Sequence, residues 1–351
     1  MGASETPPIR ARRVLARRSA LALAAVAVLA LVVYALTQLN LHRIGHALIT
    51  ASPGWIVLAL ALMGSSLVMR SVSWHQTLRA ALPDTQIPWA PVVRATMIGV
   101  MGSAVFPGRI GEPSRVLVLT RRLEGPTRSQ LPVVAGTVFS QTLINLLALG
   151  ILLAVTFTSV PLLHGHLAGI AGVLALPAIV VALVLAGPRL LARARRSRSA
   201  RVAGAGQRAA RLLELARQGL VVFARPRFGA SAVGFQLLAW ALQWLACYCV
   251  LLALGLQSHG GLVAAAAILL GVNLSAVLPA TPSNVGVFQA ACVVVLAAYG
   301  VGAGNGVAYG IILQAVEVLT ALGLGVPALL GEGLRWRDIR QGTASAGERA
   351  Q

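Results

Sequence analysis

Long apolar runs constrain this chain more than any other feature, because about 20 consecutive apolar residues suffice to cross the ~30 Å hydrocarbon core of a bilayer. The first run follows a basic N-terminus like that of a signal peptide, but it is too long for one, so we interpret it as a retained span. We predict six membrane-spanning helices, at residues 20–39, 54–73, 130–158, 165–187, 229–255 and 304–331. The chain is therefore expected to be an all-α, polytopic membrane protein.

Two further apolar stretches are interrupted by residues that break helices. Residues 90–120 are broken at Pro107-Gly108-Arg109, and residues 261–300 are broken at Pro279-Ala280-Thr281-Pro282. Each half is too short to cross a membrane, and Pro or Gly at the break removes or exposes backbone hydrogen bonds. We expect each stretch to form a re-entrant hairpin of two short helices that returns to its side of entry.

The two halves of the chain share an internal repeat. Residues 99–107 read GVMGSAVFP and residues 271–279 read GVNLSAVLP, so six of nine positions agree at an offset of 172. Residues 141–151 and 314–324 agree at five of eleven positions, at an offset of 173. We interpret this as a duplication, with repeats at about 54–158 and 229–331.

Charge predicts how the repeats sit in a membrane. Only 11% of the residues are charged, and all 29 basic residues are arginines that lie between apolar runs, which is typical of cytoplasmic loops and not of a basic face that binds nucleic acid. With both hairpins re-entrant, every arginine except Arg43 falls on the cytoplasmic side, together with both termini. The first hairpin then enters from the cytoplasm and the second from outside, which is the inverted repeat common in transporters. A bacterial inner (plasma) membrane is the expected location.

The domain organisation follows from the same pattern. Residues 1–19 form a basic cytoplasmic N-terminus, residues 20–331 a single transmembrane domain, and residues 332–351 a cytoplasmic tail. The repeats are joined by a basic connector at 188–228, whose part from 205 to 224 alternates Arg with Leu. This part is either an amphipathic helix on the membrane surface or a solvated connector.

The break of the first hairpin is the densest polar cluster within an apolar region. Gly111 allows a ligand to approach the backbone, and Glu112 lies near the positive end of a new helix. Arg109 and Arg115 can clamp a phosphate, because a guanidinium offers a forked set of permanently charged donors. In the alternative, Glu112 and Arg115, three residues apart, only neutralise each other at the interface.

The second hairpin and the long spans offer mostly neutral polar groups. The hydroxyls, amide and backbone of its break can bind a polar headgroup or simply cap a helix; these residues are Thr281, Ser283, Asn284 and Gly286. Glu317 lies inside an uninterrupted span, one turn from Gln314, and an intramembrane carboxylate is a functional candidate. Gln141 and Asn145 share a face of the equivalent span, as site residues or as hydrogen bonders between helices.

With these motifs in view, the chain resembles the transmembrane-region family of lysylphosphatidylglycerol synthases, a group of flippase-like membrane proteins. The resemblance rests on Gly108-Arg109-Ile110-Gly111-Glu112 with Arg115, on the break at 279–287 and on the pattern of spans, and it covers about residues 20–331. It implies movement of aminoacylated or other lipids between leaflets. The chain departs from the family pattern where charged residues are expected, with Ser140, Gln141, Asn145, Gln289 and Gln314 in their place.

We therefore expect a lipid flippase whose cargo is a phosphate-bearing lipid, with aminoacylated and polyprenyl lipids as the candidates. The alternatives are a membrane-embedded enzyme, or a partner of a lipid-synthesising enzyme, in phospholipid or polyprenyl-lipid synthesis, and a scaffold without cargo. No aminoacyl-transferase domain follows the last span in this sequence, and no catalytic constellation, metal site or cofactor motif is recognisable. We expect no cofactor and no enzymatic activity of the chain itself.

Overall fold

A computed structural model describes residues 46, 49–105, 111–123, 127–159, 222, 225–276 and 284–332, without the side chains of 127–129 and 153–159. The predicted spans at 20–39 and 165–187, nearly all of the connector at 188–228, and the tail beyond 332 lie outside the described residues. The predictions made for them are therefore not addressed by the structure.

Every described element of the chain is a helix. Four helices are long and apolar enough to cross a membrane: α3 (Pro53–Ala81), α6 (Thr127–Ser159), α10 (Pro226–Ala253) and α13 (Ala303–Gly331). These four confirm four of the predicted spans. Each interrupted stretch forms two short helices, as expected: α4 (Trp89–Val105) with α5 (Gly111–Thr120), and α11 (Gly261–Ser275) with α12 (Val287–Ala297).

The predicted end of the second span, at residue 73, is wrong, because α3 continues to Ala81. Hydropathy falls after Arg70, but the polar residues that follow are buried against other helices. The hydroxyl of Ser71 donates to the Leu67 carbonyl, and that of Ser73 donates across to the Ala232 carbonyl of α10 at 2.8 Å. Polar side chains that are satisfied in this way continue the helix.

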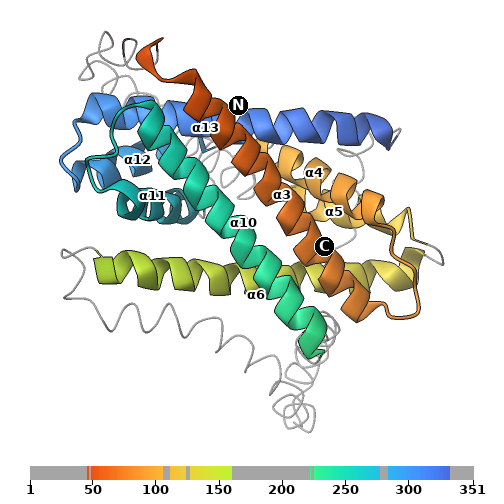
Figure 1. Cartoon of the computed structure of the whole chain (residues 1–351). Coiled ribbons are helices and arrows are strands. Elements are labelled where there is room, and N and C mark those ends of the chain that lie inside the picture. The colour runs from red at the N-terminus through yellow and green to blue at the C-terminus, as the bar shows by residue number, and fades with distance from the viewer. Residues whose placement is uncertain are drawn as a thin grey trace, which may run out of the picture.

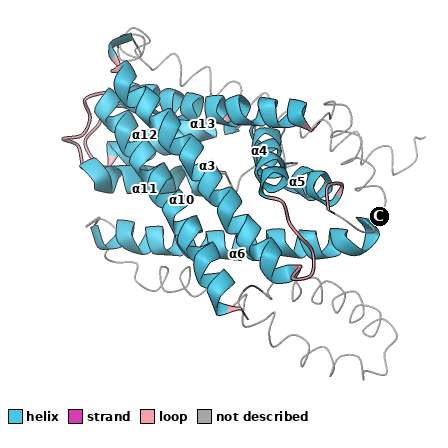
Figure 2. Ribbon diagram, turned by 45° about the vertical axis from the view of Figure 1, so that its right-hand side comes forward, coloured by secondary structure: helices cyan, strands magenta, loops and turns pink. Residues whose placement is uncertain are grey.

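The centre of the fold is an antiparallel pair formed by α3 and α10. At one end the Ser52 N–H donates to the Ala253 carbonyl at 2.9 Å, and toward the other end Ser73 contacts Ala232. The pair crosses the molecule obliquely, with α13 along one side and α6 along the other (Figure 1). The α4–α5 pair and the α11–α12 pair lie at opposite ends of this arrangement (Figures 1 and 2).

Each pair of short helices begins and ends in the same place. Arg94 of α4 and Arg122, just beyond α5, both bind the carboxylate of Glu332 at the end of α13, at 3.1 and 2.6 Å. The Glu332 side chain is only 2% exposed. At the other end of the molecule, Gly260 precedes α11 and packs directly against the Tyr299 ring, which follows α12. Both pairs are therefore hairpins in shape.

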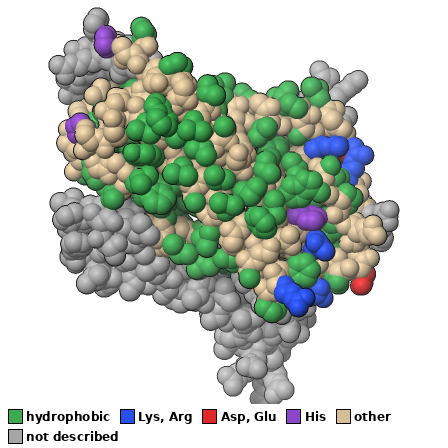
Figure 3. Space-filling model, viewed as in Figure 1, with side chains coloured by type: hydrophobic (Ala, Val, Ile, Leu, Met, Phe, Trp, Pro, Cys, Tyr) green, Lys and Arg blue, Asp and Glu red, His purple; other side chains and the backbone are tan. Residues whose placement is uncertain are grey.

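Charged side chains gather at one end of the described structure. Arginines surround the base of the α4–α5 hairpin, whereas the surface over α3 and α10 is largely apolar (Figure 3). The opposite end is built from residues 49–58, 253–262 and 298–304, and these segments contain no Asp, Glu, Lys or Arg. An apolar face with a charged end is the surface expected of a helix bundle in lipid.

Candidate functional site

Besides one small apolar cluster, the described bundle contains two large apolar cores. One is built around the α11–α12 hairpin and includes Met63 and Val316, and the other is built around the α4–α5 hairpin and includes Leu67 and Val134. Near the boundary, each long helix carries polar side chains within about one turn of its middle. We call this set the central polar layer: Arg70 on α3, Gln141 and Asn145 on α6, Gln236 and Gln243 on α10, and Gln314 and Glu317 on α13.

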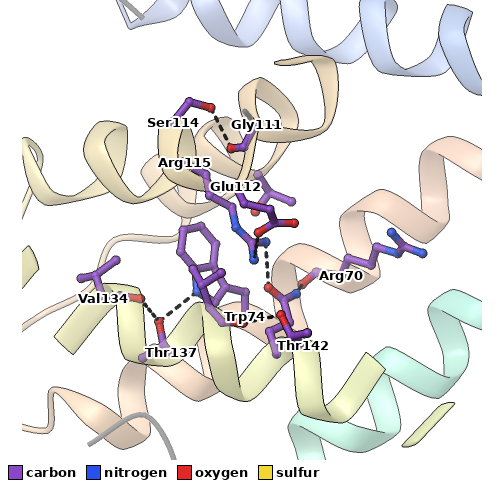
Figure 4. Close-up of polar contacts among 12 residues, drawn as sticks. Arg70, Trp74, Gly111, Glu112, Ser114, Arg115, Val134, Thr137 and Thr142 are labelled. Atoms are coloured by element: carbon purple, nitrogen blue, oxygen red, sulfur yellow. Dashed lines mark hydrogen bonds and ion pairs between the residues drawn. The ribbon is translucent and has the colours of Figure 1, made fainter. Parts of the chain in front are cut away.

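Arg115 of α5 reaches this layer from the first hairpin. Its guanidinium donates to Gln141 Oε1 at 2.8 Å and forms an ion pair with Glu112 at 2.6 Å. It lies 4.8 Å from the ring centroid of Trp74, whose indole N–H donates in turn to Thr137 (Figure 4). The Arg115 side chain is only 10% exposed, so its ion pair with Glu112 is not an ordinary surface ion pair. Three contacts fix the position of the guanidinium: the carboxylate of Glu112, the ring of Trp74 and the amide of Gln141.

Arg70 and Arg115 belong to one electrostatic network. Arg70 donates to Gln243 Oε1 at 2.8 Å, and Gln141 donates to the Arg70 carbonyl while it accepts from Arg115. The carboxylates of Glu317 and Glu112 attract the Arg70 guanidinium electrostatically, and the guanidinium of Arg115 repels it. The Nε atoms of Arg70 and Arg115 are buried and have no hydrogen-bond partner among the described residues. Buried donors of this kind are uncommon and need an acceptor.

The second hairpin repeats part of this arrangement with neutral groups. Gln289 of α12 donates to Gln314 of α13, much as Arg115 of α5 donates to Gln141 of α6. Gln289 also accepts the Gly286 N–H at 2.7 Å, and Asn284 donates to the Ser275 carbonyl of its own hairpin at 3.2 Å. The contacts of Asn284 and Gly286 are local, as the helix-capping alternative predicts.

Asn145 serves as an acceptor between helices. Its Oδ1 accepts from Gln236 at 2.9 Å and from the Trp240 indole at 2.8 Å. These contacts tie α6 to α10, in agreement with the alternative in which Asn145 bonds neighbouring helices. None of the hydrogen bonds described for Asn145 reaches Arg115 or Glu317.

Gly111 sets the geometry of the first hairpin. A Cβ at this position would collide with the Gly99 carbonyl oxygen and the Ser103 hydroxyl and would lie 2.7 Å from the Ser103 backbone nitrogen. Only glycine allows α5 to start this close to α4. The close approach places Arg115, one turn later, over Trp74. The contacts among the described residues therefore indicate that Gly111 is needed for the packing of α5 against α4.

The structure thus brings together some of the predicted site residues. Glu112, Arg115 and Gln141 form one cluster, Gly286, Gln289 and Gln314 form another, and Glu317 is linked to the first through Arg70. Arg109, Thr281 and Ser283 lie outside the described residues.

Sequence reasoning missed five polar residues of the interior: Arg70, Trp74, Gln236, Trp240 and Gln243. The sequence carried a signal for one of them: Arg70 lies inside a predicted span, and a cation within a span is a functional candidate.

Comparisons with known proteins bear on the family of this chain. No curated protein matches it. Residues 20–325 match the family model of the lysylphosphatidylglycerol synthase transmembrane region. That match covers both hairpins, the long helices α3, α6 and α10, most of α13 and the central polar layer. The chain is therefore a multi-pass membrane protein that belongs to the lysylphosphatidylglycerol synthase transmembrane-region family.

Proposed function

We propose that this protein is a transporter that moves a phosphate-bearing lipid between the two leaflets of the bacterial inner membrane. The observation that carries the proposal is the pair of arginines near the middle of the bundle, Arg115 buried and Arg70 half-buried, each with a buried Nε donor that no described residue uses. Buried charge at the centre of a membrane bundle is costly and is a mark of function. The family name, which refers to a phospholipid-synthesising enzyme, supports a lipid as the ligand.

We infer that the two halves are inverted repeats. The order long, short, short, long occurs in both, and the long helices α3 and α10 both begin at a proline, Pro53 and Pro226. Arg70 and Gln243 are 173 residues apart, which is the repeat offset, and they touch at 2.8 Å. Equivalent residues meet in this way where a two-fold axis passes between two related halves. The opposite placement of the hairpins supports the same inference (Figure 2).

The charged end of the molecule then faces the cytoplasm. Arginines surround the base of the first hairpin, and the positive-inside rule assigns such an end to the cytoplasmic side. The first hairpin would enter the membrane from the cytoplasm and the second from outside. Half-inserted segments that meet near the midplane are the usual site of secondary transporters.

The residues of this site have different roles. Arg70 and Arg115 hold the phosphate, because guanidinium groups bind phosphate oxygens with charge-assisted hydrogen bonds. Trp74 and Gln141 keep Arg115 in position. The Gln289–Gln314 pair offers neutral hydrogen bonds to the rest of the headgroup from the second half. The two halves rock about the α3–α10 contact and open the site to one leaflet at a time.

Removing the charge of Arg115 tests the proposal. In liposomes with fluorescent phosphatidylglycerol, Arg115→Gln is expected to slow leaflet exchange by about 10- to 100-fold, because a hydrogen bond to a charged group contributes roughly 1.5–3 kcal/mol. Arg121→Gln is the matched control, since Arg121 is exposed and lies six residues further along the chain; its exchange rate should stay within about twofold of wild type.

Two results would contradict the proposal. The first is wild-type protein that exchanges lipid no faster than protein-free liposomes do, and the second is an Arg121→Gln variant that slows exchange as much as Arg115→Gln does. Turnover of the headgroup without exchange would support the alternative, a membrane-embedded enzyme of lipid synthesis. Phosphate release or headgroup change, followed by mass spectrometry of the same liposomes, separates the two functions.

A further inference from the structure

Glu317 is a carboxylate at the middle of a membrane-spanning helix, and among the described residues no cation of the transport site pairs with it directly. It is half-buried on α13. The ion pairs of the described residues are Arg94–Glu332, Arg122–Glu332 and Arg115–Glu112, and Glu317 takes part in none of them. An ionised carboxylate at this depth is costly unless it is paired or takes up a proton.

Few groups of the described residues face Glu317. The helices packed against α13 are α3, α4, α10 and α12. On these helices and on α13 itself, four titratable groups interact electrostatically with Glu317: Arg70, Cys247, Cys292 and Tyr309. The charged residue of α4, Arg94, is bound to Glu332. Because thiols and a phenol are neutral near pH 7, Arg70 is the one cation of the described residues that attracts this carboxylate.

Two groups on different helices attract the Arg70 guanidinium: Gln243 of α10 and Glu317 of α13. In this structure it donates to the neutral Gln243 of α10 at 2.8 Å, while its Nε is unused among the described residues. An ionised Glu317 would draw the guanidinium toward α13 and away from α10. The observed contact leaves Glu317 without a direct ion pair among the described residues.

We propose that Glu317 is a proton-binding site that couples lipid movement to proton movement. This inference rests on the proposed transport function. An ionised Glu317 and a lipid phosphate are both anions that compete for Arg70, so protonation of Glu317 frees Arg70 for the lipid. Proton and lipid then bind together and cross together, and deprotonation on the far side returns Arg70 to Glu317 and releases the phosphate.

The coupling predicts a leaflet asymmetry driven by a pH gradient. The full chain is reconstituted in liposomes with fluorescent phosphatidylglycerol, with the membrane potential held at zero by potassium and valinomycin. A gradient of one pH unit is expected to shift the lipid about tenfold toward the alkaline leaflet, because one unit corresponds to about 1.36 kcal/mol. A trapped pH dye should record proton entry during the shift.

Substitution of Glu317 gives a second, independent measurement. Binding of a short-chain fluorescent phosphatidylglycerol to purified wild-type protein should strengthen as pH falls, by up to about tenfold per unit where Glu317 is mostly ionised. Glu317→Gln imitates the protonated side chain, so its affinity should equal that of wild type at low pH and should not change with pH. Asp84→Asn is the control, since Asp84 is an exposed acid at the charged end, and it should keep the wild-type pH dependence.

The outcomes distinguish this inference from the proposed function. Exchange that runs equally fast with no gradient-driven asymmetry in wild type would overturn the proton coupling and leave lipid transport standing. A pH dependence of binding that survives in Glu317→Gln would overturn the assignment to Glu317. Absence of any exchange by wild type would overturn the transport function and this inference together.

Discussion

Replacing Arg70 with methionine is expected to abolish lipid exchange, with a fall in rate of about 100-fold or more. The substitution keeps an unbranched side chain of similar length but removes the charge near the middle of α3. Gln243 then loses its donor, Glu317 loses the cation that attracts it, and the phosphate loses one of its two guanidinium groups. A hydrogen bond to a charged group contributes roughly 1.5–3 kcal/mol, so loss of the bonds to Gln243 and to the phosphate corresponds to about 100-fold or more in rate or affinity.

Arg79→Met is the matched control for this prediction. Arg79 lies on the same helix, is exposed, and stacks over the Phe228 ring at 5.5 Å. Loss of an exposed cation–π contact costs only about 0.5–1 kcal/mol, so exchange should fall by less than about fivefold. The measurement is the initial rate of leaflet exchange of fluorescent phosphatidylglycerol in liposomes. Equal losses in the two variants would show that Arg70 has no special part in transport.

Replacing Gly111 with alanine is expected to destabilise the protein more than alanine at any other described glycine, because an added Cβ would approach its neighbours most closely at this position. The new Cβ would meet backbone atoms of Gly99 and Ser103, which cannot rotate away as a flexible side chain can. Overpacking costs typically 1–3 kcal/mol and occasionally more, and contact with backbone places this site at about 3 kcal/mol. The α4–α5 hairpin would have to open, which would also move Arg115 away from Trp74.

Thermal unfolding of the detergent-purified protein measures this effect. Gly234→Ala is the control, because Gly234 is an exposed glycine inside α10 where an added methyl group would meet no atom within 4 Å. Alanine there should stabilise the helix by about 0.5–1 kcal/mol. A melting temperature of Gly111→Ala at or above the wild-type value would show that the two hairpin arms are not in the contact described.

Hydropathy and breaks in the apolar runs were sufficient to predict the described helices. Four spans and both pairs of short helices lie within a few residues of their predicted bounds, apart from the end of α3. That end was missed because a hydropathy window counts Ser71, Ser73 and Trp74 as polar, whereas in the structure they are buried and hydrogen-bonded. The order long, short, short, long recurs in the described helices of both halves, as the repeat proposed from the sequence predicts.

The candidate site was only partly predictable, because its contacts differ in sequence separation. The Glu112–Arg115 ion pair is local, three residues apart on one helix, and the spacing alone predicts it. The contacts of Arg115 with Gln141 and Trp74 depend on how α5 packs against α3 and α6, which no pattern in one sequence reveals. A span that ends at residue 73 places Arg70 at its cytoplasmic end, so the central position of Arg70 was missed together with the end of α3.

Cysteine labelling in intact cells tests whether the two hairpins enter the membrane from opposite faces. Cys247, Cys249 and Cys292 are buried and are first replaced with alanine. A single cysteine is then introduced as Arg121→Cys, beside the first hairpin, or as Ser258→Cys, beside the second; both positions are exposed. A membrane-impermeant maleimide is expected to label Ser258→Cys in intact cells and to label Arg121→Cys only after the cells are permeabilised. Labelling of both from the same side would contradict entry from opposite faces.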